Sequence, residues 1–264
     1  MNIAALVKPV PDSTEPEYSL SESRILREKY GYLQNADDSA VVEMSLRLKE
    51  QYGGEVDLIT MADEKAEEML RDYLAMGADR AIRISGEELK GSDGLVTAKV
   101  LVSVLRKKTY DVILAGIRSA DGKGGQIGAR IAQALQLPCI TNIAGVGTYS
   151  DGKLLIQKRI GNRMMEIKVT LPVVLTIQRH AAPARLASVH GILEAMMKEI
   201  VVYSPSELGF PPEQVGYSGS SIRIHSVSTH TLTKTFQKLE GTPEEIAEKI
   251  IQILLQHNIL ERRE

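Results

Sequence analysis

Apolar and polar positions follow two periods in the first half of the chain. Short apolar runs predict buried strands at residues 2–7, 56–61, 81–84 and 111–115. Apolar residues at helical spacing between them predict helices at 38–52, 63–76, 92–108 and 125–136, with Asp63 and Ser92 or Asp93 as candidate caps. Parallel strands need such crossovers. We therefore expect an α/β fold with a doubly wound, mostly parallel, Rossmann-like sheet.

The pattern changes after about residue 148. Two strand-like runs at 154–160 and 164–171 flank Gly161-Asn162, a two-residue turn that predicts a β-hairpin. An apolar strand at 173–177 and an exposed loop at 178–190 follow. A final helix is predicted at 243–257, where Thr242, Pro243 and Glu245 give a capping box with proline at the first helical position.

These elements predict three parts of the chain. Residues 1–202 form an α/β domain that includes the hairpin region 149–177. Residues 203–221 are rich in proline, glycine and serine, so we expect a linker over 203–225. Residues 226–264 then form a C-terminal arm, whose apolar helix face is wide enough to bury against a partner or against its own domain.

Composition narrows the class of protein. The 264 residues carry a formal net charge of −2, and the absence of a basic excess argues against nucleic acid as a partner. A single cysteine, Cys139, rules out an intrachain disulfide and argues against a cysteine-based zinc site. No apolar run reaches membrane-spanning length, and the first residues do not resemble a signal peptide. We expect a cytoplasmic protein without a membrane span.

Candidate chemistry centres on residues 111–128, DVILAGIRSADGKGGQIG. A buried strand leads into a glycine-rich loop and a helix start, a geometry that brings backbone N–H groups to a phosphate. On composition alone, an ordinary glycine-rich turn fits equally well. Lys8, at the end of the first strand, is either a phosphate ligand or a solvated lysine. No histidine or carboxylate pattern of a metal or catalytic site accompanies the loop, so the sequence favours a carrier over a hydrolase.

Five segments in order resemble the β subunit of electron-transfer flavoproteins over nearly the whole chain. Val7–Asp12 is similar to the family's V-K-x-V-P-D, and Asn35–Glu43 to N-P-x-D-x-x-A-x-E. The other three similar segments are Leu70–Arg80, the loop Gly116–Gly128 and Arg185–Ala195. Ala36, Asp37 and the run Lys123-Gly124-Gly125 depart from the family pattern.

The resemblance implies a heterodimer with an α subunit, an FAD shared with that subunit, and a further nucleotide in this chain. That nucleotide is AMP in simpler members and a second FAD in electron-bifurcating members, and the sequence leans only slightly to FAD. Carried over by motif, the nucleotide-binding residues are Lys8, Asn35, Asp38, Met61, Ala62, Asp121, Gly122, Gly124, Gly125, Gln126 and Gly128. Lys123 adds a charge that pairs with a phosphate or points to water.

The resemblance also implies a recognition loop, 178–197, for a flavin dehydrogenase such as an acyl-CoA dehydrogenase. Its carried-over residues are Arg185, Val189, Gly191 and Ile192. The C-terminal arm is expected to contact the α subunit. Two alternatives stay open: a stand-alone adenine-nucleotide sensor without a redox partner, and a structural subunit with a degenerate pocket.

Overall fold

The computed structural model describes residues 1–260 except 15, 229–235, 237 and 258. They form two compact units, Met1–Val227 and Ser228–Glu264. The second unit contains helix α7 (Pro243–Gln256), and Thr242 and Glu245 close the predicted capping box there. This agreement follows from local chemistry, because the Thr242 side chain and the Glu245 side chain each satisfy a backbone N–H at the helix start.

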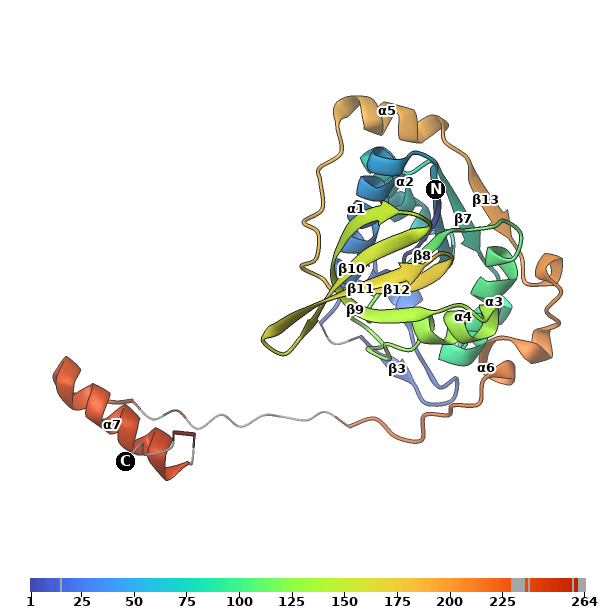
Figure 1. The fold of residues 1–264 in the computed structure, drawn as a ribbon. Helices are drawn as coiled ribbons and strands as arrows, with labels where there is room; N and C mark the ends of the chain where they lie inside the picture. The colour runs from blue at the N-terminus through green and yellow to red at the C-terminus, as the bar shows by residue number, and fades with distance from the viewer. Residues whose placement is uncertain (15, 229–235, 237, 258, 261–264) are drawn as a thin grey trace. The chain divides into compact units, whose positions relative to one another are not determined.

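The first unit is built on one nine-stranded sheet (Figure 1). From edge to edge its strands are β11 (Arg163–Thr170), β10 (Lys153–Ile160), β9 (Cys139–Ser150), β12 (Val173–Ile177), β8 (Val112–Gly116), β1 (Asn2–Leu6), β6 (Glu55–Met61), β7 (Arg80–Ile84) and β13 (Ile200–Tyr203). All neighbours from β9 to β13 in this order pair in parallel, whereas β9, β10 and β11 pair antiparallel. The α/β prediction with an added hairpin is therefore confirmed.

Helices cover both faces of the sheet. The helices of this unit are α1 (Ala36–Tyr52), α2 (Ala66–Met76), α3 (Gly94–Leu105), α4 (Ile127–Leu135), α5 (Val189–Met197) and the short α6 (Gly216–Gly219). Buried residues of α1 and α2 pack with one side of the central strands, and those of α3 and α4 pack with the other. The strands between them are apolar on both faces, as expected for a parallel sheet.

Short elements complete the unit. Two small antiparallel pairs join β2 (Pro9–Pro11) to β5 (Tyr32–Gln34) and β3 (Tyr18–Ser19) to β4 (Arg24–Ile25). The 3-10 helices are η1 (Arg27–Lys29), η2 (Glu87–Leu89), η3 (Ser206–Leu208) and η4 (Pro212–Gln214). The excursion between β2 and α1 therefore carries its own local structure rather than a plain loop.

The predicted linker over 203–221 does not match the structure. Leu208, Phe210 and Val215 pack against the apolar cluster around α3, and Val215 is fully buried. The Ser220 hydroxyl accepts from Asp93 N and donates to Gly91 O. Proline and glycine mark tight turns as well as linkers, and here apolar side chains between those turns bury against the domain.

The structure also differs from the sequence prediction at the starts of two helices. The segment 178–197 is not a loop throughout, because α5 begins at Val189 with the Ser188 side chain accepting from Gly191 N. Helix α2 begins at Ala66, later than Asp63 would cap it. The Asp63 carboxylate instead accepts from Lys65 N and from the Tyr32 hydroxyl. A local cap therefore sets the start of α5, whereas at α2 the predicted cap residue is bound to other partners.

Candidate functional site

A cavity of the first unit lies at the carboxyl ends of the central strands and has a volume of about 980 Å³. Its walls come from the turns that follow β1, β6, β7 and β8, together with the excursion at residues 18–32. In the sheet, β1 lies between β6, the next strand of this sheet along the chain, and β8, which comes later. The strand order therefore reverses direction between β1 and β8, and these two strands form the topological switch point. Open α/β sheets bind ligands at such a point.

Asp121 holds three segments of this wall together. Its carboxylate is 1% exposed and lies 2.6 Å from Lys8 Nζ, which follows β1, and 2.7 Å from Arg27 Nη2 in η1. Gly122 N also donates to Asp121 Oδ1. The buried carboxylate thus joins the end of β1, the excursion and the glycine-rich loop, and it leaves one net positive charge at the cavity.

The three titratable groups at this point have shifted pKa values. Burial raises the pKa of Asp121, but Lys8 and Arg27 outweigh it and hold that pKa well below its usual range. Burial and the nearby Arg27 lower the pKa of Lys8 to about 8. Burial raises the pKa of Asp38 to about 7, although Lys8 N donates to its Oδ2. The site therefore combines a firmly ionised carboxylate with two groups that titrate near neutral pH.

Asn35 fixes the glycine-rich loop from the opposite side. Its Nδ2 donates to Arg118 O at 3.1 Å, and its Oδ1 accepts from Ala120 N at 3.1 Å. The end of β8 can lie close to the start of α1 because Gly116 has no side chain. A Cβ at Gly116 would lie 2.3 Å from Asp38 Oδ1. Asn35 occupies the cap position of α1 without capping it, so its side chain serves the loop instead.

The loop presents bare backbone to the cavity. Gly124 has open space where a Cβ would lie, Gly125 has a φ of +61°, and Gln126 stands at the N-cap of α4. The first amides of a helix have no acceptor within it, so the start of α4 offers donors and a partial positive charge to an anion. Glycine backbone, helix start and the lysine–arginine pair together fit a nucleotide phosphate.

The predicted nucleotide-binding residues mostly meet in this cavity. Those that line it are Lys8, Asn35, Asp38, Met61, Ala62, Asp121, Gly122, Gly124, Gly125 and Gln126. Lys123 does not line it and is exposed with a φ of +51°. Gly128 does not line it either, and its role is to let α4 approach β12, because a Cβ there would lie 2.5 Å from Thr176 Cγ2.

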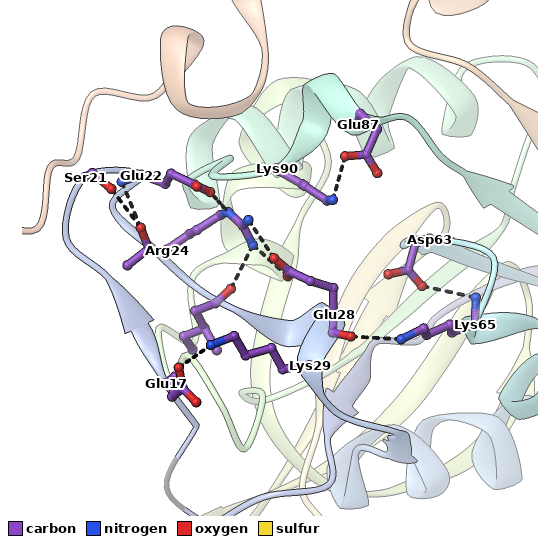
Figure 2. A network of polar contacts seen from close by, with 12 residues as sticks. Glu17, Ser21, Glu22, Arg24, Glu28, Lys29, Asp63, Lys65, Glu87 and Lys90 are labelled. Atoms are coloured by element: carbon purple, nitrogen blue, oxygen red, sulfur yellow. Dashed lines mark hydrogen bonds and ion pairs between the residues drawn. The ribbon is translucent and has the colours of Figure 1, made fainter.

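A charged network fastens the excursion over the cavity (Figure 2). Arg24 donates to both carboxylate oxygens of Glu28 at 2.7 Å, and Lys65 Nζ donates to Glu28 O at 2.9 Å. The hydrogen bonds from Arg24 lower the pKa of Glu28 to about 2. Lys90 pairs with Glu87 on the neighbouring turn. The Arg24–Glu28 pair is part-buried and the Lys90–Glu87 pair is more exposed, and together they order the rim of the cavity.

Sequence reasoning missed Arg27, Thr60 and Arg83, which also line the cavity. Arg27 lies far from any recognisable motif, and only the tertiary fold brings it to Asp121. Thr60 and Arg83 did carry a signal, since each is a polar residue between two apolar residues inside a largely buried strand. Such residues require a partner or a ligand.

The predicted recognition residues lie on and before α5, which packs on α2 (Figure 1). Gly191 is buried against α2, where a Cβ would lie 2.2 Å from Ala75 O. Arg185 pairs with the buried Glu43 at 2.8 Å and with Glu50, so it anchors the segment to α1. Val189 and Ile192 lie on the outer side, and Val189 is 79% exposed.

Further apolar side chains extend that outer surface. The exposed apolar residues of this segment are Leu186, Val189, Ile192, Leu193, Met196 and Met197. We call them the α5 face. A contiguous apolar surface of this kind marks an interaction site on many proteins.

Comparisons with known proteins agree with this architecture. Residues 25–208 match the model of the electron transfer flavoprotein domain. The chain is 30% identical over 261 residues to the electron transfer flavoprotein subunit beta of Thermoanaerobacterium thermosaccharolyticum, covering 98% of this chain and 100% of that protein. It is also 30% identical over 263 residues to subunit CarD of the caffeyl-CoA reductase-Etf complex of Acetobacterium woodii, covering 98% and 100%.

A third relative is the acryloyl-CoA reductase electron transfer subunit gamma of Anaerotignum propionicum, 30% identical over 268 residues, with 98% of this chain and 100% of that protein covered. Within the described part of the chain, no helix is both long enough and apolar enough to cross a membrane.

Proposed function

The chain belongs to the electron transfer flavoprotein family, among its β subunits, and from that membership we propose that it carries electrons between a flavin dehydrogenase and other redox carriers. It does so as one half of a heterodimer with an α subunit, which shares an FAD with it. The redox chemistry belongs to the flavin, whereas the protein positions the cofactor and sets its electrostatic surroundings.

We further propose that the cavity holds an adenine nucleotide of its own. The observation that carries this proposal is the junction of Lys8, Arg27 and Asp121 beside the bare backbone of Gly124 and Gly125. The start of α4 and the glycine amides would receive the phosphates, and the residues after β6 would flank the base. A cavity of about 980 Å³ lies at the upper end of the range for ligand pockets, roughly 300–1,000 Å³, which favours a dinucleotide over AMP.

Nucleotide analysis of the purified heterodimer tests both points. The chain is co-expressed with its α subunit, the complex is denatured, and released nucleotides are counted by chromatography. We expect two FAD per heterodimer. One FAD with one AMP would retain the carrier and make the second nucleotide structural. No flavin and no stable α subunit would contradict the carrier role and favour a nucleotide sensor.

The α5 face is proposed as the docking surface for the dehydrogenase partner. Its apolar side chains stand on a helix that Gly191 and Ala195 fix to α2, so the surface is rigid before a partner binds. Val189→Glu should slow electron exchange with the dehydrogenase at least tenfold and leave the heterodimer and its nucleotides intact. Leu33→Glu, at an exposed apolar residue outside this face, is the matched control.

The second unit is proposed as an arm that contacts the α subunit. Helix α7 is amphipathic, with Ile246, Ile250, Ile253 and Leu254 on one side of a helix whose other positions are largely charged or polar. Truncation after residue 227 should weaken the heterodimer in gel filtration. A truncated chain that pairs with its partner as tightly as the full chain would contradict this role.

A further inference from the structure

Helix α5 buries very little apolar surface of its own. Of its 9 residues, only Gly191 and Ala195 are buried, and these are the two smallest residues of the helix. Hydrophobic stabilisation grows with the apolar area removed from water, so these two residues contribute little. A helix this short is also only marginally stable by itself in water. Other contacts must therefore hold α5 on the domain.

Two cations join the carboxyl ends of α2 and α5. Arg71 of α2 donates from Nη1 to Ala195 O at 2.6 Å and to Lys198 O at 2.7 Å. Lys198, which follows α5, donates from Nζ to Leu74 O at 3.0 Å and to Ala78 O at 2.8 Å. Each helix thus supplies the cation that binds carbonyl groups at the end of the other, where the helix dipole is negative.

These hydrogen bonds fix the last turn of α5 without using an apolar side chain. Arg71 binds one carbonyl group before Met196 and Met197 and one after them. The backbone of these two methionines is therefore fixed, while their side chains are 71% and 87% exposed. At the other end of the helix, the Ser188 side chain caps α5 and Gly191 lies against α2. The whole α5 face is left free for a partner.

We propose that Arg71 and Lys198 are positioning residues for electron exchange, because they hold α5 in the orientation in which the α5 face meets the dehydrogenase. This inference rests on the proposed docking role of the α5 face. Both cations act through the backbone of α5 and need no contact with the dehydrogenase. If α5 is released from α2, only a fraction of the molecules presents the face correctly, and the apparent affinity for the partner falls by that fraction.

Steady-state electron exchange between the complete heterodimer and its dehydrogenase tests the proposal, with the heterodimer as the varied substrate. Arg71→Met removes both hydrogen bonds to α5 and should raise the KM for the heterodimer about 3- to 30-fold. The kcat should change less than about twofold, because neither Arg71 nor Lys198 lines the nucleotide cavity. Arg71→Lys keeps a charged donor and should recover part of the loss. Lys198→Met should raise the KM as well.

Glu67→Gln is the matched control. Arg71 Nη2 also donates to Glu67 Oε1 at 3.1 Å, in an exposed ion pair within α2. The control removes this ion pair and leaves both hydrogen bonds from Arg71 to α5 in place, so its KM should stay within about twofold of the wild type. Amide hydrogen exchange should quicken over residues 189–197 in Arg71→Met and Lys198→Met, but not in Glu67→Gln.

The outcomes separate failure of the positioning role from failure of the docking surface. An unchanged KM in Arg71→Met would overturn the positioning role, whether or not exchange over α5 quickens. A loss confined to kcat, or an equal rise of KM in Glu67→Gln, would overturn it as well. If Val189→Glu slows electron exchange and Arg71→Met does not, the docking surface stands without the positioning role. An unchanged rate in Val189→Glu would contradict the docking surface itself.

Discussion

Removal of the Asp121 charge should loosen the whole nucleotide-binding end of the sheet. In Asp121→Asn the side chain keeps its shape and an oxygen that accepts from Gly122 N, but it loses its charge. Lys8 and Arg27, both within 2.7 Å of Asp121 Oδ2, then face each other without a counterion. The mutation therefore breaks an ion-paired junction without creating a cavity.

The expected cost follows from burial. Breaking a fully buried ion pair costs about 3–5 kcal/mol. Asp121 is 1% exposed, but the side chains of Lys8 and Arg27 are 39% and 33% exposed, so water screens part of the interaction. We expect a loss of about 2–3 kcal/mol at pH 7. For a unit of this size that lowers the melting temperature by roughly 4–12 °C.

The pH dependence of the unfolding free energy provides an independent test. The folded pKa of Asp121 is lowered from its ordinary value of 3.8, so its ionised form stabilises the fold above about pH 4. That contribution is lost as the pH falls further towards the folded pKa. The gap in unfolding free energy between wild type and Asp121→Asn should therefore be larger at pH 5 than below pH 4, where it shrinks as the pH falls.

Urea unfolding followed by circular dichroism measures this gap at pH 7 and at steps below pH 4. Glu213→Gln makes the same change in net charge at an exposed residue and should lie within about 0.5 kcal/mol of the wild type. The reasoning is refuted if Asp121→Asn is as stable as this control at pH 7, or if its deficit persists undiminished at low pH.

Three further outcomes are expected. Gly128→Ala should lower the unfolding free energy by about 1–3 kcal/mol, because its Cβ would lie 2.5 Å from Thr176 Cγ2. Adding Thr176→Ser should recover most of that loss in urea unfolding. No recovery would mean that another contact is responsible. Arg185→Gln should cost roughly 1–3 kcal/mol by leaving the buried Glu43 with Arg47 alone, and hydrogen exchange should quicken over 178–188 but not in the central strands. Asp38 has its folded pKa raised from 3.8 to about 7 by burial, so its contribution to stability falls as the pH rises between these values. At 1.36 kcal/mol per pKa unit, Asp38→Asn should therefore gain about 2–3 kcal/mol relative to the wild type between pH 5 and pH 8, and a constant difference across that range would show that Asp38 is ionised throughout.

Periodicity predicted the order of the central strands and helices because both are local signals. The hairpin followed from Gly161-Asn162, and the α7 cap from Thr242 and Glu245. The linker prediction was wrong because composition does not say whether the apolar residues between prolines find a surface. Leu208, Phe210 and Val215 found one beside α3, which only the folded sheet provides.

The candidate site divides in the same way. Lys8, Asn35 and the glycine-rich loop were identifiable because each follows a strand at the same sheet edge or carries a family motif. The partners of Asp121 were not, nor was the lack of a partner for Arg83 Nε among the described residues, because both depend on residues far apart in the chain.

By itself, then, the sequence determined the fold class and the family, and it predicted the residues of the proposed nucleotide site. Periodicity, turns and caps act over a few residues and can be read along the chain. Only the tertiary structure decided which charges meet, such as Arg27 with Asp121 across 94 residues, and which polar atoms have no partner among the described residues, such as Arg83 Nε. The physical reason is that the energy of a buried charge depends on its neighbours in space, and the fold alone sets those neighbours.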